Sequence, residues 1–254
     1  MSDRRRFLKG LTSLPLATVL ASPRLAAAVS AGLQEVEAKL SDGRTVKGAL
    51  AVPQGQSEGS ILLVHEWWGL NDQIKSVASD FARQGYTALA VDLYHGQVAH
   101  TRDGARSLMQ SVDQNVATET LKLWVPWLRE RSTSGGKVAT IGWCFGGGWS
   151  LNASLAAPVD ATIIYYGRVN KMADELVTLK GPVLGHFATQ DTWINKEMVS
   201  GFEAAMDAAG KSYTNYWYDA QHAFANPTSA RYDAGDAALA WQRTTDFLKQ
   251  QLRA

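Results

Sequence analysis

Short apolar runs recur along the chain from residue 60 onwards, and each is followed by a longer segment with helical periodicity. The segment 60–64 is apolar after its first residue, which is typical of a strand buried on both faces of a parallel sheet. Within the segment 115–131, Leu121, Trp124 and Leu128 lie three or four positions apart and therefore share one face of a helix. We predict strands at 60–64, 86–91, 137–141, 161–165, 182–187 and 213–218. We predict helices at 73–84, 115–131, 147–156, 196–209 and 230–252.

The alternation of strand and helix predicts right-handed βαβ crossovers. Two earlier runs, 33–40 and 46–52, flank a polar, Gly-containing connection at 41–44, which indicates an antiparallel hairpin. The chain contains no internal repeat and no linker that would divide it. We therefore expect one α/β domain over residues 31–254, with a mostly parallel, doubly wound sheet and helices on both faces.

The first thirty residues have the order of features found in an export signal. Three arginines, Arg4 to Arg6, precede Phe7-Leu8-Lys9, a mild apolar run covers 11–21, and Ala26-Ala27-Ala28 follows. This order resembles a twin-arginine signal and predicts periplasmic localisation through the export machinery, with cleavage after Ala28. The run is shorter than the roughly 20 residues of a membrane span, so we expect no stable span. The alternative is a basic tail with no targeting role.

Composition and charge narrow the kind of partner. The chain has 254 residues, and Lys+Arg 25 against Asp+Glu 24 leaves a formal charge of +1, which favours neither nucleic acid nor an anionic membrane. A small molecule is the more plausible ligand. A single cysteine, Cys144, can form no internal disulfide and no site that needs paired thiolates.

This cysteine lies in a motif of distinctive spacing. The predicted strand 137–141 is followed by Gly142-Trp143-Cys144-Phe145-Gly146, which matches the Gly-x-nucleophile-x-Gly turn of hydrolases with Cys in place of Ser. A sharp strand-to-helix turn requires residues without side chains at Gly142 and Gly146, and it places the sulfur at a helix N-terminus that favours a thiolate. The alternatives are a small buried hydrophobic residue and a phosphate-binding loop.

A nucleophile on such a sheet requires an acid and then a base at later strand ends. Asp191 follows the run 182–188, and His222 follows the run 213–218. We expect Asp191 to orient the imidazole and His222 to accept the thiol proton. Asp191 could instead cap the helix near Trp193, His222 could serve only its loop, and Asp219 competes for the role of the acid.

The residues then resemble the dienelactone hydrolase family of α/β-hydrolases over about residues 33–252. The resemblance rests on His65-Glu66-Trp67-Trp68-Gly69-Leu70-Asn71, Asp92-Leu93-Tyr94, Gly142-Trp143-Cys144-Phe145-Gly146-Gly147, Asp191 and His222-Ala223-Phe224. It implies a single domain without cofactor or metal, and an activity that opens a cyclic enol ester to a keto-dicarboxylic acid. It also implies roles for individual residues: Cys144 as nucleophile, His222 as base, Asp191 as its orienter, Glu66 as a carboxylate that contacts the resting thiol and releases it when substrate binds, and the backbone N–H groups of Trp67 and Phe145 as the oxyanion hole.

The departures from the family concern the substrate. Two arginines that hold the substrate carboxylate in the type enzyme are replaced here by His95 and Asn226. Arg168, just after the run 161–165, either substitutes for them or pairs with a surface acid. Tryptophans flank the proposed site and either line a pocket for a larger, less charged ester or pack beneath the loops. The predicted pocket residues are Trp68, Tyr94, His95, Trp143, Arg168, Trp193 and Asn226.

Together these features predict a periplasmic hydrolase of a small-molecule ester or lactone that works through a thioester on Cys144. An activated ester is expected because a thiol favours good leaving groups. The alternative is a protein with a hydrolase fold that binds a hydrophobic ligand without turning it over.

Overall fold

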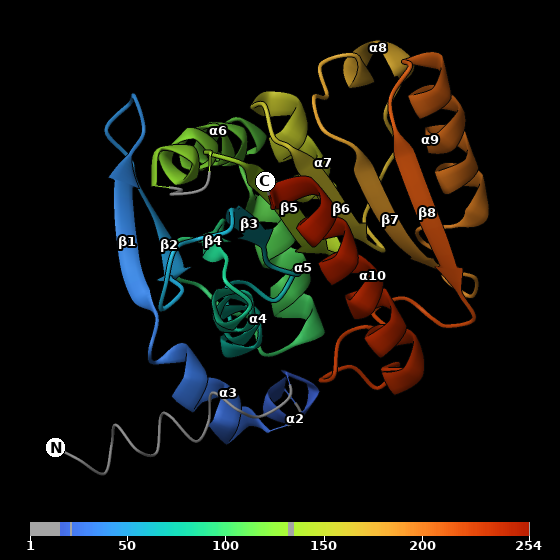
Figure 1. Cartoon of the computed structure of the whole chain (residues 1–254). Coiled ribbons are helices and arrows are strands. Elements are labelled where there is room, and N and C mark those ends of the chain that lie inside the picture. The colour runs from blue at the N-terminus through green and yellow to red at the C-terminus, as the bar shows by residue number, and fades with distance from the viewer. Residues whose placement is uncertain (1–15, 21, 132–134, 254) are drawn as a thin grey trace, which may run out of the picture.

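The computed structural model describes residues 16–20, 22–131 and 135–253. Eight strands form one sheet in the order β1-β2-β4-β3-β5-β6-β7-β8 (Figure 1). The strands are β1 Gln34–Lys39, β2 Thr45–Ala51, β3 Ser60–Val64, β4 Thr87–Asp92, β5 Val138–Trp143, β6 Ala161–Tyr165, β7 Val183–Ala188 and β8 Tyr213–Tyr218. The helices are α2 Leu16–Leu20, α3 Pro23–Ser30, α4 Asp72–Arg83, α5 Arg102–Ser111, α6 Gln114–Arg131, α7 Phe145–Ala156, α8 Ala173–Leu176, α9 Lys196–Ala208 and α10 Ala234–Leu252.

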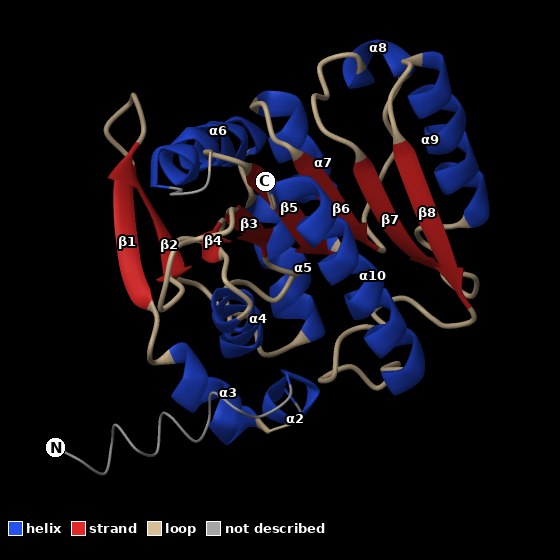
Figure 2. Ribbon diagram, viewed as in Figure 1, coloured by secondary structure: helices blue, strands red, loops and turns tan. Residues whose placement is uncertain are grey.

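The sheet is antiparallel only at one edge. β1 pairs antiparallel with β2, and β2 pairs antiparallel with β4, as expected of the hairpin. The other six strands are parallel, so their carboxyl ends meet at one edge (Figure 2). The expected α/β class, the hairpin and the mostly parallel sheet are confirmed.

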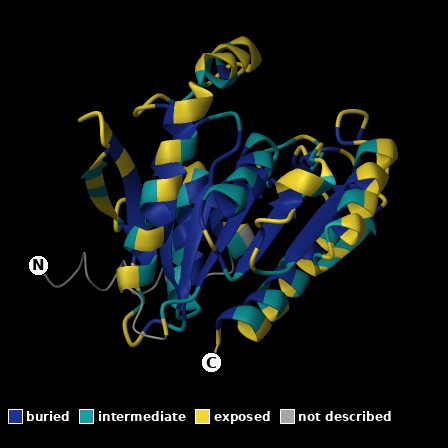
Figure 3. Cartoon of the chain, turned by 90° about the horizontal axis from the view of Figure 1, so that it is seen from above, coloured by how far each residue is buried: buried dark blue, intermediate teal, exposed yellow. Residues whose placement is uncertain are grey.

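Helices cover both faces of the sheet because alternate residues of each strand point to opposite sides. In β3, Ile61 and Leu63 belong to the core cluster shared with α4 and α10, whereas Leu62 and Val64 belong to the cluster shared with α6 and α7. A third cluster lies between β6, β7 and α9. Figure 3 shows the buried strands between helices whose outer faces are exposed.

Within the predicted domain of residues 31–254, two helices, α5 and α8, were not predicted from the sequence. α5 has few apolar residues and buries only Ala105, so little in its sequence marks it as core-facing. Its start is set by the Thr101 side chain, which accepts from the Gly104 N–H at 3.1 Å. α8 is four residues long. α10 begins at Ala234 instead of 230, because the Asp233 carboxylate accepts the Asp236 N–H and caps the helix there.

The N-terminal segment contacts the domain. α3 packs on α4, where Ser30 Oγ donates to Asp72 Oδ1 at 2.6 Å and Ser76 Oγ donates to the Ala26 carbonyl at 3.2 Å. Residues 16–20 and 22–30, which we assigned to a signal outside the domain, therefore lie against it, and the predicted cleavage position after Ala28 falls inside α3. The three arginines lie outside the described residues. Within the described part of the chain, no helix is long and apolar enough to cross a membrane.

In the turn from β5 into α7, the backbone at Gly142 approaches that at Gly146, and the backbone at Gly146 approaches the end of β3 at Val64. A Cβ atom on Gly142 would lie 1.9 Å from the carbonyl oxygen of Gly146, and a Cβ atom on Gly146 would lie 2.2 Å from that of Val64. Both distances are far below van der Waals contact, so both positions require glycine. The glycines of the sequence motif therefore have the steric role predicted for them.

We expect Gly146→Ala to lower the free energy of unfolding by about 3 kcal/mol, because the added methyl group meets a backbone carbonyl that cannot move freely. Gly201→Ala is the matched control, since it lies in α9 with no atom within 4 Å of its Cβ position, and it should raise stability by about 0.5–1 kcal/mol. Urea unfolding of both variants measures this difference. Equal effects of the two substitutions would contradict the steric account.

Candidate active site

Cys144 lies in the turn between β5 and α7 with φ +54° and ψ −116°. This left-handed conformation is strained for a residue with a side chain and is typical of functional sites. The Cys144 N–H donates to the Tyr165 carbonyl at 3.0 Å, which fixes the turn to β6. Burial and the nearby Glu66 carboxyl group raise the pKa of the thiol well above its usual value, whereas the Phe145 backbone N–H lowers it. The resting thiol is therefore neutral.

His222 connects this thiol to Asp191. The His222 ring lies in the loop after β8, with Nε2 3.1 Å from Cys144 Sγ and Nδ1 2.6 Å from Asp191 Oδ2. Because the ionised Asp191 only accepts hydrogen bonds, we assign the imidazole proton to Nδ1, which leaves Nε2 free to accept the thiol proton. The three residues that the sequence placed at separate strand ends thus form one hydrogen-bonded chain.

Asp191 does not cap the next helix, since the N-cap of α9 is Asn195, but it also holds the loop that follows it. Its Oδ1 accepts the backbone N–H groups of Trp193 and Ile194 at 2.9 and 3.0 Å, while Oδ2 binds His222. Burial alone would raise the pKa of Asp191, but the hydrogen bond from His222 and those from the two N–H groups together lower it. Its competitor Asp219 instead accepts from Thr189 Oγ1 and Gln190 Nε2, both at 3.1 Å, at the surface.

Glu66 follows β3 and is 4% exposed. Its Oε2 accepts from Asn226 Nδ2 at 2.5 Å, and its Oε1 has no hydrogen-bond partner among the described residues. Burial raises the pKa of Glu66 to about 7, against the opposing effects of His222, Asn226, the Tyr166 hydroxyl and Arg231. The family resemblance implies a contact of Glu66 with the resting thiol, but here the thiol bonds to His222 and Glu66 bonds to Asn226.

His65 joins the ends of two strands beneath the site. Its Nε2 accepts the Leu93 N–H at 3.2 Å, so Nδ1 carries the proton and donates to the Glu66 carbonyl at 2.6 Å. Complete burial lowers the pKa of His65 and keeps the ring neutral. The ring also contacts Tyr94 at 4.6 Å and Phe145 at 5.9 Å between centroids. His65 therefore supports the loop that carries Glu66.

Tryptophan side chains lie beside His222 and on the loop that follows Glu66. Trp193 is 61% exposed, and its ring stands perpendicular to the His222 ring with 5.2 Å between centroids. The half-buried rings of Trp67 and Trp68 are 5.1 Å apart on the loop after Glu66. Of the predicted residues, Trp193 therefore contacts the catalytic His222, and Trp67 and Trp68 directly follow Glu66 along the chain.

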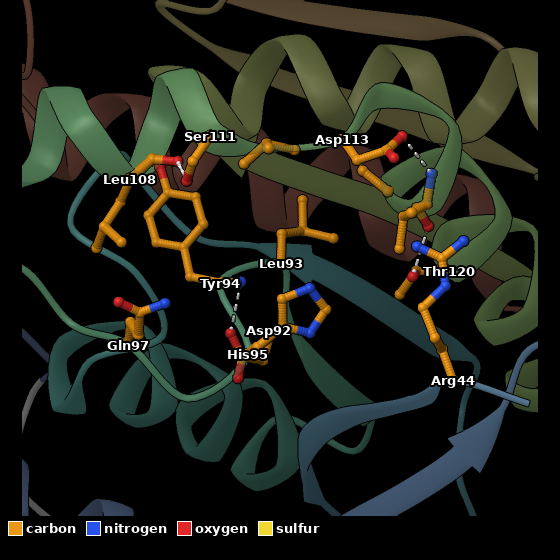
Figure 4. Close-up of a pocket in the computed structure, with 13 residues that line it drawn as sticks. Arg44, Asp92, Leu93, Tyr94, His95, Gln97, Leu108, Ser111, Asp113 and Thr120 are labelled. Atoms are coloured by element: carbon orange, nitrogen blue, oxygen red, sulfur yellow. Dashed lines mark hydrogen bonds between the residues drawn. The ribbon is translucent and has the colours of Figure 1, made fainter.

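Other predicted pocket residues lie elsewhere. Trp143 belongs to the core cluster of the α4 and α10 face, and Asn226 is buried on Glu66. Arg168 is exposed, and it has no ion pair within the described ranges. His95 and Tyr94 line a separate cavity of about 110 Å³ at the end of β4 (Figure 4). Its other labelled wall residues are Arg44, Asp92, Leu93, Gln97, Leu108, Ser111, Asp113 and Thr120. The Tyr94 ring also packs on His65 and Phe145, so Tyr94 lies between this cavity and the site of the thiol.

The sequence reasoning missed two residues at the site. Arg231 places its guanidinium carbon 5.5 Å from the Trp193 ring centroid, and its charge lowers the pKa values of Glu66 and Cys144. Tyr166 is fully buried after β6, with its ring 5.1 Å from that of His222. No spacing rule marks Arg231, but Tyr166 directly follows a predicted strand and could have been found from that position. No group of three His, Cys, Asp or Glu side chains in the described part of the chain could hold a metal ion.

An eight-stranded, mostly parallel sheet that presents a nucleophile, an acid and a histidine in this chain order defines an α/β-hydrolase. The profile of the dienelactone hydrolase family matches residues 46–252. The chain belongs to the dienelactone hydrolase family and is an enzyme of the hydrolase class.

Individual relatives agree with this assignment. The carboxymethylenebutenolidase of Pseudomonas putida is 29% identical over 222 residues, which cover 82% of this chain and 92% of that relative. Protein usf of Aquifex pyrophilus is 31% identical over 228 residues, which cover 83% of this chain and 96% of that relative. A dienelactone hydrolase-like promiscuous phosphotriesterase from metagenomic libraries shares the fold, with a TM-score of 0.77 at 21% identity over 86% of this chain and 98% of that chain.

The raised pKa of Glu66 makes stability depend on pH. A carboxyl group whose pKa is about 7 when folded and 4.5 when unfolded binds more protons in the folded state between these values, so stability falls as pH rises from 4.5 to 7. We expect wild type to lose about 3 kcal/mol relative to Glu66→Gln over this range. Urea unfolding of both proteins at pH 5 and pH 8 measures this change in their stability difference. A constant difference between the two proteins would show that Glu66 is not held in this environment.

Proposed function

We propose that the protein hydrolyses an activated ester or lactone through a thioester intermediate on Cys144. The observation that carries this proposal is the chain of contacts from Cys144 Sγ to His222 Nε2 at 3.1 Å and from His222 Nδ1 to Asp191 at 2.6 Å. A thiol that is hydrogen-bonded to the ring nitrogen of a histidine, itself oriented by a carboxylate, is the arrangement that general-base activation of a nucleophile requires.

In the first step, the sulfur attacks the carbonyl carbon while His222 Nε2 takes the thiol proton. The oxyanion that forms accepts hydrogen bonds from the backbone N–H groups of Phe145, at the start of α7, and Trp67. When the tetrahedral intermediate collapses, His222 returns the proton to the leaving oxygen, and an alcohol or enol departs. Asp191 stabilises the imidazolium ion between these two transfers.

In the second step, water attacks the thioester carbonyl while His222 accepts a proton from it. The C–S bond then breaks, the sulfur regains its proton from His222, and a carboxylic acid is released. Because a thiolate is itself a good leaving group, an amide nitrogen would be expelled less readily than the sulfur. The proposed substrate therefore has a good leaving group, such as the enolate of an enol lactone.

The surroundings of the thiol support a substrate with an apolar part. Trp67, Trp68 and Trp193 are available around the catalytic side chains, and Arg231 adds one cation beside Trp193. The two positions where the type enzyme carries arginines are His95 and Asn226, of which the first is exposed at a separate cavity and the second is bound to Glu66. The names of relatives such as the carboxymethylenebutenolidase of Pseudomonas putida support a lactone.

Kinetics of site variants test this mechanism. We expect Cys144→Ala to abolish hydrolysis of p-nitrophenyl acetate, and Asp191→Asn to lower kcat by about 10³–10⁴-fold, because an amide in place of the carboxylate favours the wrong imidazole tautomer. Asp219→Asn is the matched control and should stay within twofold of wild type. Full activity of Cys144→Ala would contradict the mechanism. Binding of a hydrophobic ligand without hydrolysis of any ester or lactone tested would favour the alternative binding function.

We also propose that the chain is exported to the periplasm by the twin-arginine route, on the order of arginines, apolar run and alanines in residues 1–28. Because α3 contains the position after Ala28 and lies on α4, the helix must leave α4 before a peptidase can cut there. Mass spectrometry of the periplasmic protein should find a chain that begins near residue 29. An intact chain confined to the cytoplasm would contradict this proposal.

A further inference from the structure

The Glu66 carboxyl group is held from one side by a buried amide. Asn226 is 3% exposed, and its Nδ2 donates to Glu66 Oε2 at 2.5 Å. Its Oδ1 accepts from the Thr228 N–H at 2.8 Å and from Thr228 Oγ1 at 2.7 Å. The amide group therefore cannot rotate by half a turn without losing both bonds to Thr228 and placing its oxygen against the Glu66 carboxyl group. The Asn226 donor is fixed in the direction of Glu66.

A buried tyrosine faces the same carboxyl group. Tyr166 is fully buried directly after β6 and has φ +36°, a conformation that is costly for a residue with a side chain. Its hydroxyl and Glu66 Oε1 each have no formed hydrogen bond among the described residues, yet the hydroxyl lies close enough to lower the pKa of Glu66. A buried donor and a buried acceptor without other partners gain most by interacting with each other.

The position of Glu66 matters because a negative charge there opposes thiolate formation. Glu66 is one of the groups that raise the pKa of the Cys144 thiol. The charged or titratable groups that act on Glu66 are His222, Tyr166 and Arg231, together with the thiol itself. Among these groups, Tyr166 can hold the carboxyl group without taking part in the reaction. The uncharged Asn226, which donates to Glu66, can do the same.

We propose that Asn226 and Tyr166 are positioning residues that hold the Glu66 carboxyl group beside the thiol but not bonded to it, and so set how strongly Glu66 opposes ionisation of Cys144. The thiol then bonds to His222 before any substrate arrives, and acylation needs no release of Glu66. This inference rests on the proposed function in taking Cys144 as the nucleophile. It gives Asn226 and Tyr166 roles that act through Glu66 and not through the substrate.

Alkylation of the thiol tests the inference without a substrate. Cys144 is the only cysteine of the chain, so the mass added by iodoacetamide reports on this residue alone. In wild type, the rise of the alkylation rate with pH should become shallower near pH 7, where Glu66 becomes charged. Glu66→Gln should remove this inflection and raise the rate severalfold at pH 8.

Two variants then separate positioning from structure. Asn226→Leu keeps a similar volume but has no donor. In wild type the Asn226 hydrogen bond lowers the pKa of Glu66, so its loss should raise that pKa and move the inflection upward by roughly one to two pH units. Tyr166→Phe, which removes only a hydroxyl, should move it in the same direction. In a Glu66→Gln background, neither variant should change the shape of the profile, whereas a merely structural role would act there too.

Tyr213→Phe is the matched control, since it removes another buried hydroxyl without a hydrogen-bond partner, on the α9 side of β8, and it should leave the profile unchanged. An inflection that stays in place in both Asn226→Leu and Tyr166→Phe would overturn the inference, as would a profile that still changes in the Glu66→Gln background. The expected shifts in a protein that hydrolyses no ester or lactone would support the inference while contradicting the proposed function.

Discussion

The close approach of backbone to backbone at the end of β5 is the constraint on which the rest of the site depends. Gly142 and Gly146 leave no space for side chains where this strand turns into α7, and the turn places Cys144 in a left-handed conformation. A second pair of glycines extends the contact, since a Cβ atom on Gly167 would lie 2.5 Å from the backbone of Gly147. The start of α7 and the end of β6 are thereby drawn together, and Tyr166 is brought next to the nucleophile.

Burial then decides the chemistry that this geometry permits. Cys144 is half-buried and Glu66 is buried, and the pKa of each group is raised because its charged form loses solvation. A thiol that stays neutral at rest needs a base at the moment of attack, and His222 is already in contact with it. Asp191 remains ionised because three hydrogen-bond donors offset its burial. One environment thus keeps a thiol neutral and a carboxylate charged within the same hydrogen-bonded chain.

The sequence was sufficient for the parts of the molecule that local pattern determines. Apolar runs marked five of the six parallel strands, and the segment 213–218 was predicted as the last strand after them. The order of Cys144, Asp191 and His222 placed the three residues at strand ends that share one edge. Long-range contacts were not predictable in this way. The bond between Glu66 and Asn226 joins residues 160 positions apart, and no spacing indicates that an amide four residues after the histidine should turn toward the loop after β3. α5 was missed because it has few apolar residues, and the docking of α3 on α4 was missed because it depends on contacts between distant residues, such as that of Ser30 with Asp72.

The central claim is that the sulfur of Cys144 forms a covalent acyl intermediate. Intact-protein mass spectrometry shortly after mixing with p-nitrophenyl acetate tests it most directly, with Cys144→Ala as the comparison. The account predicts an acetyl adduct on wild type that peptide mapping places on Cys144 and that decays as product forms, and no adduct on the variant. Product release by wild type with no adduct on Cys144 at any time, or an equal adduct on the variant, would contradict it.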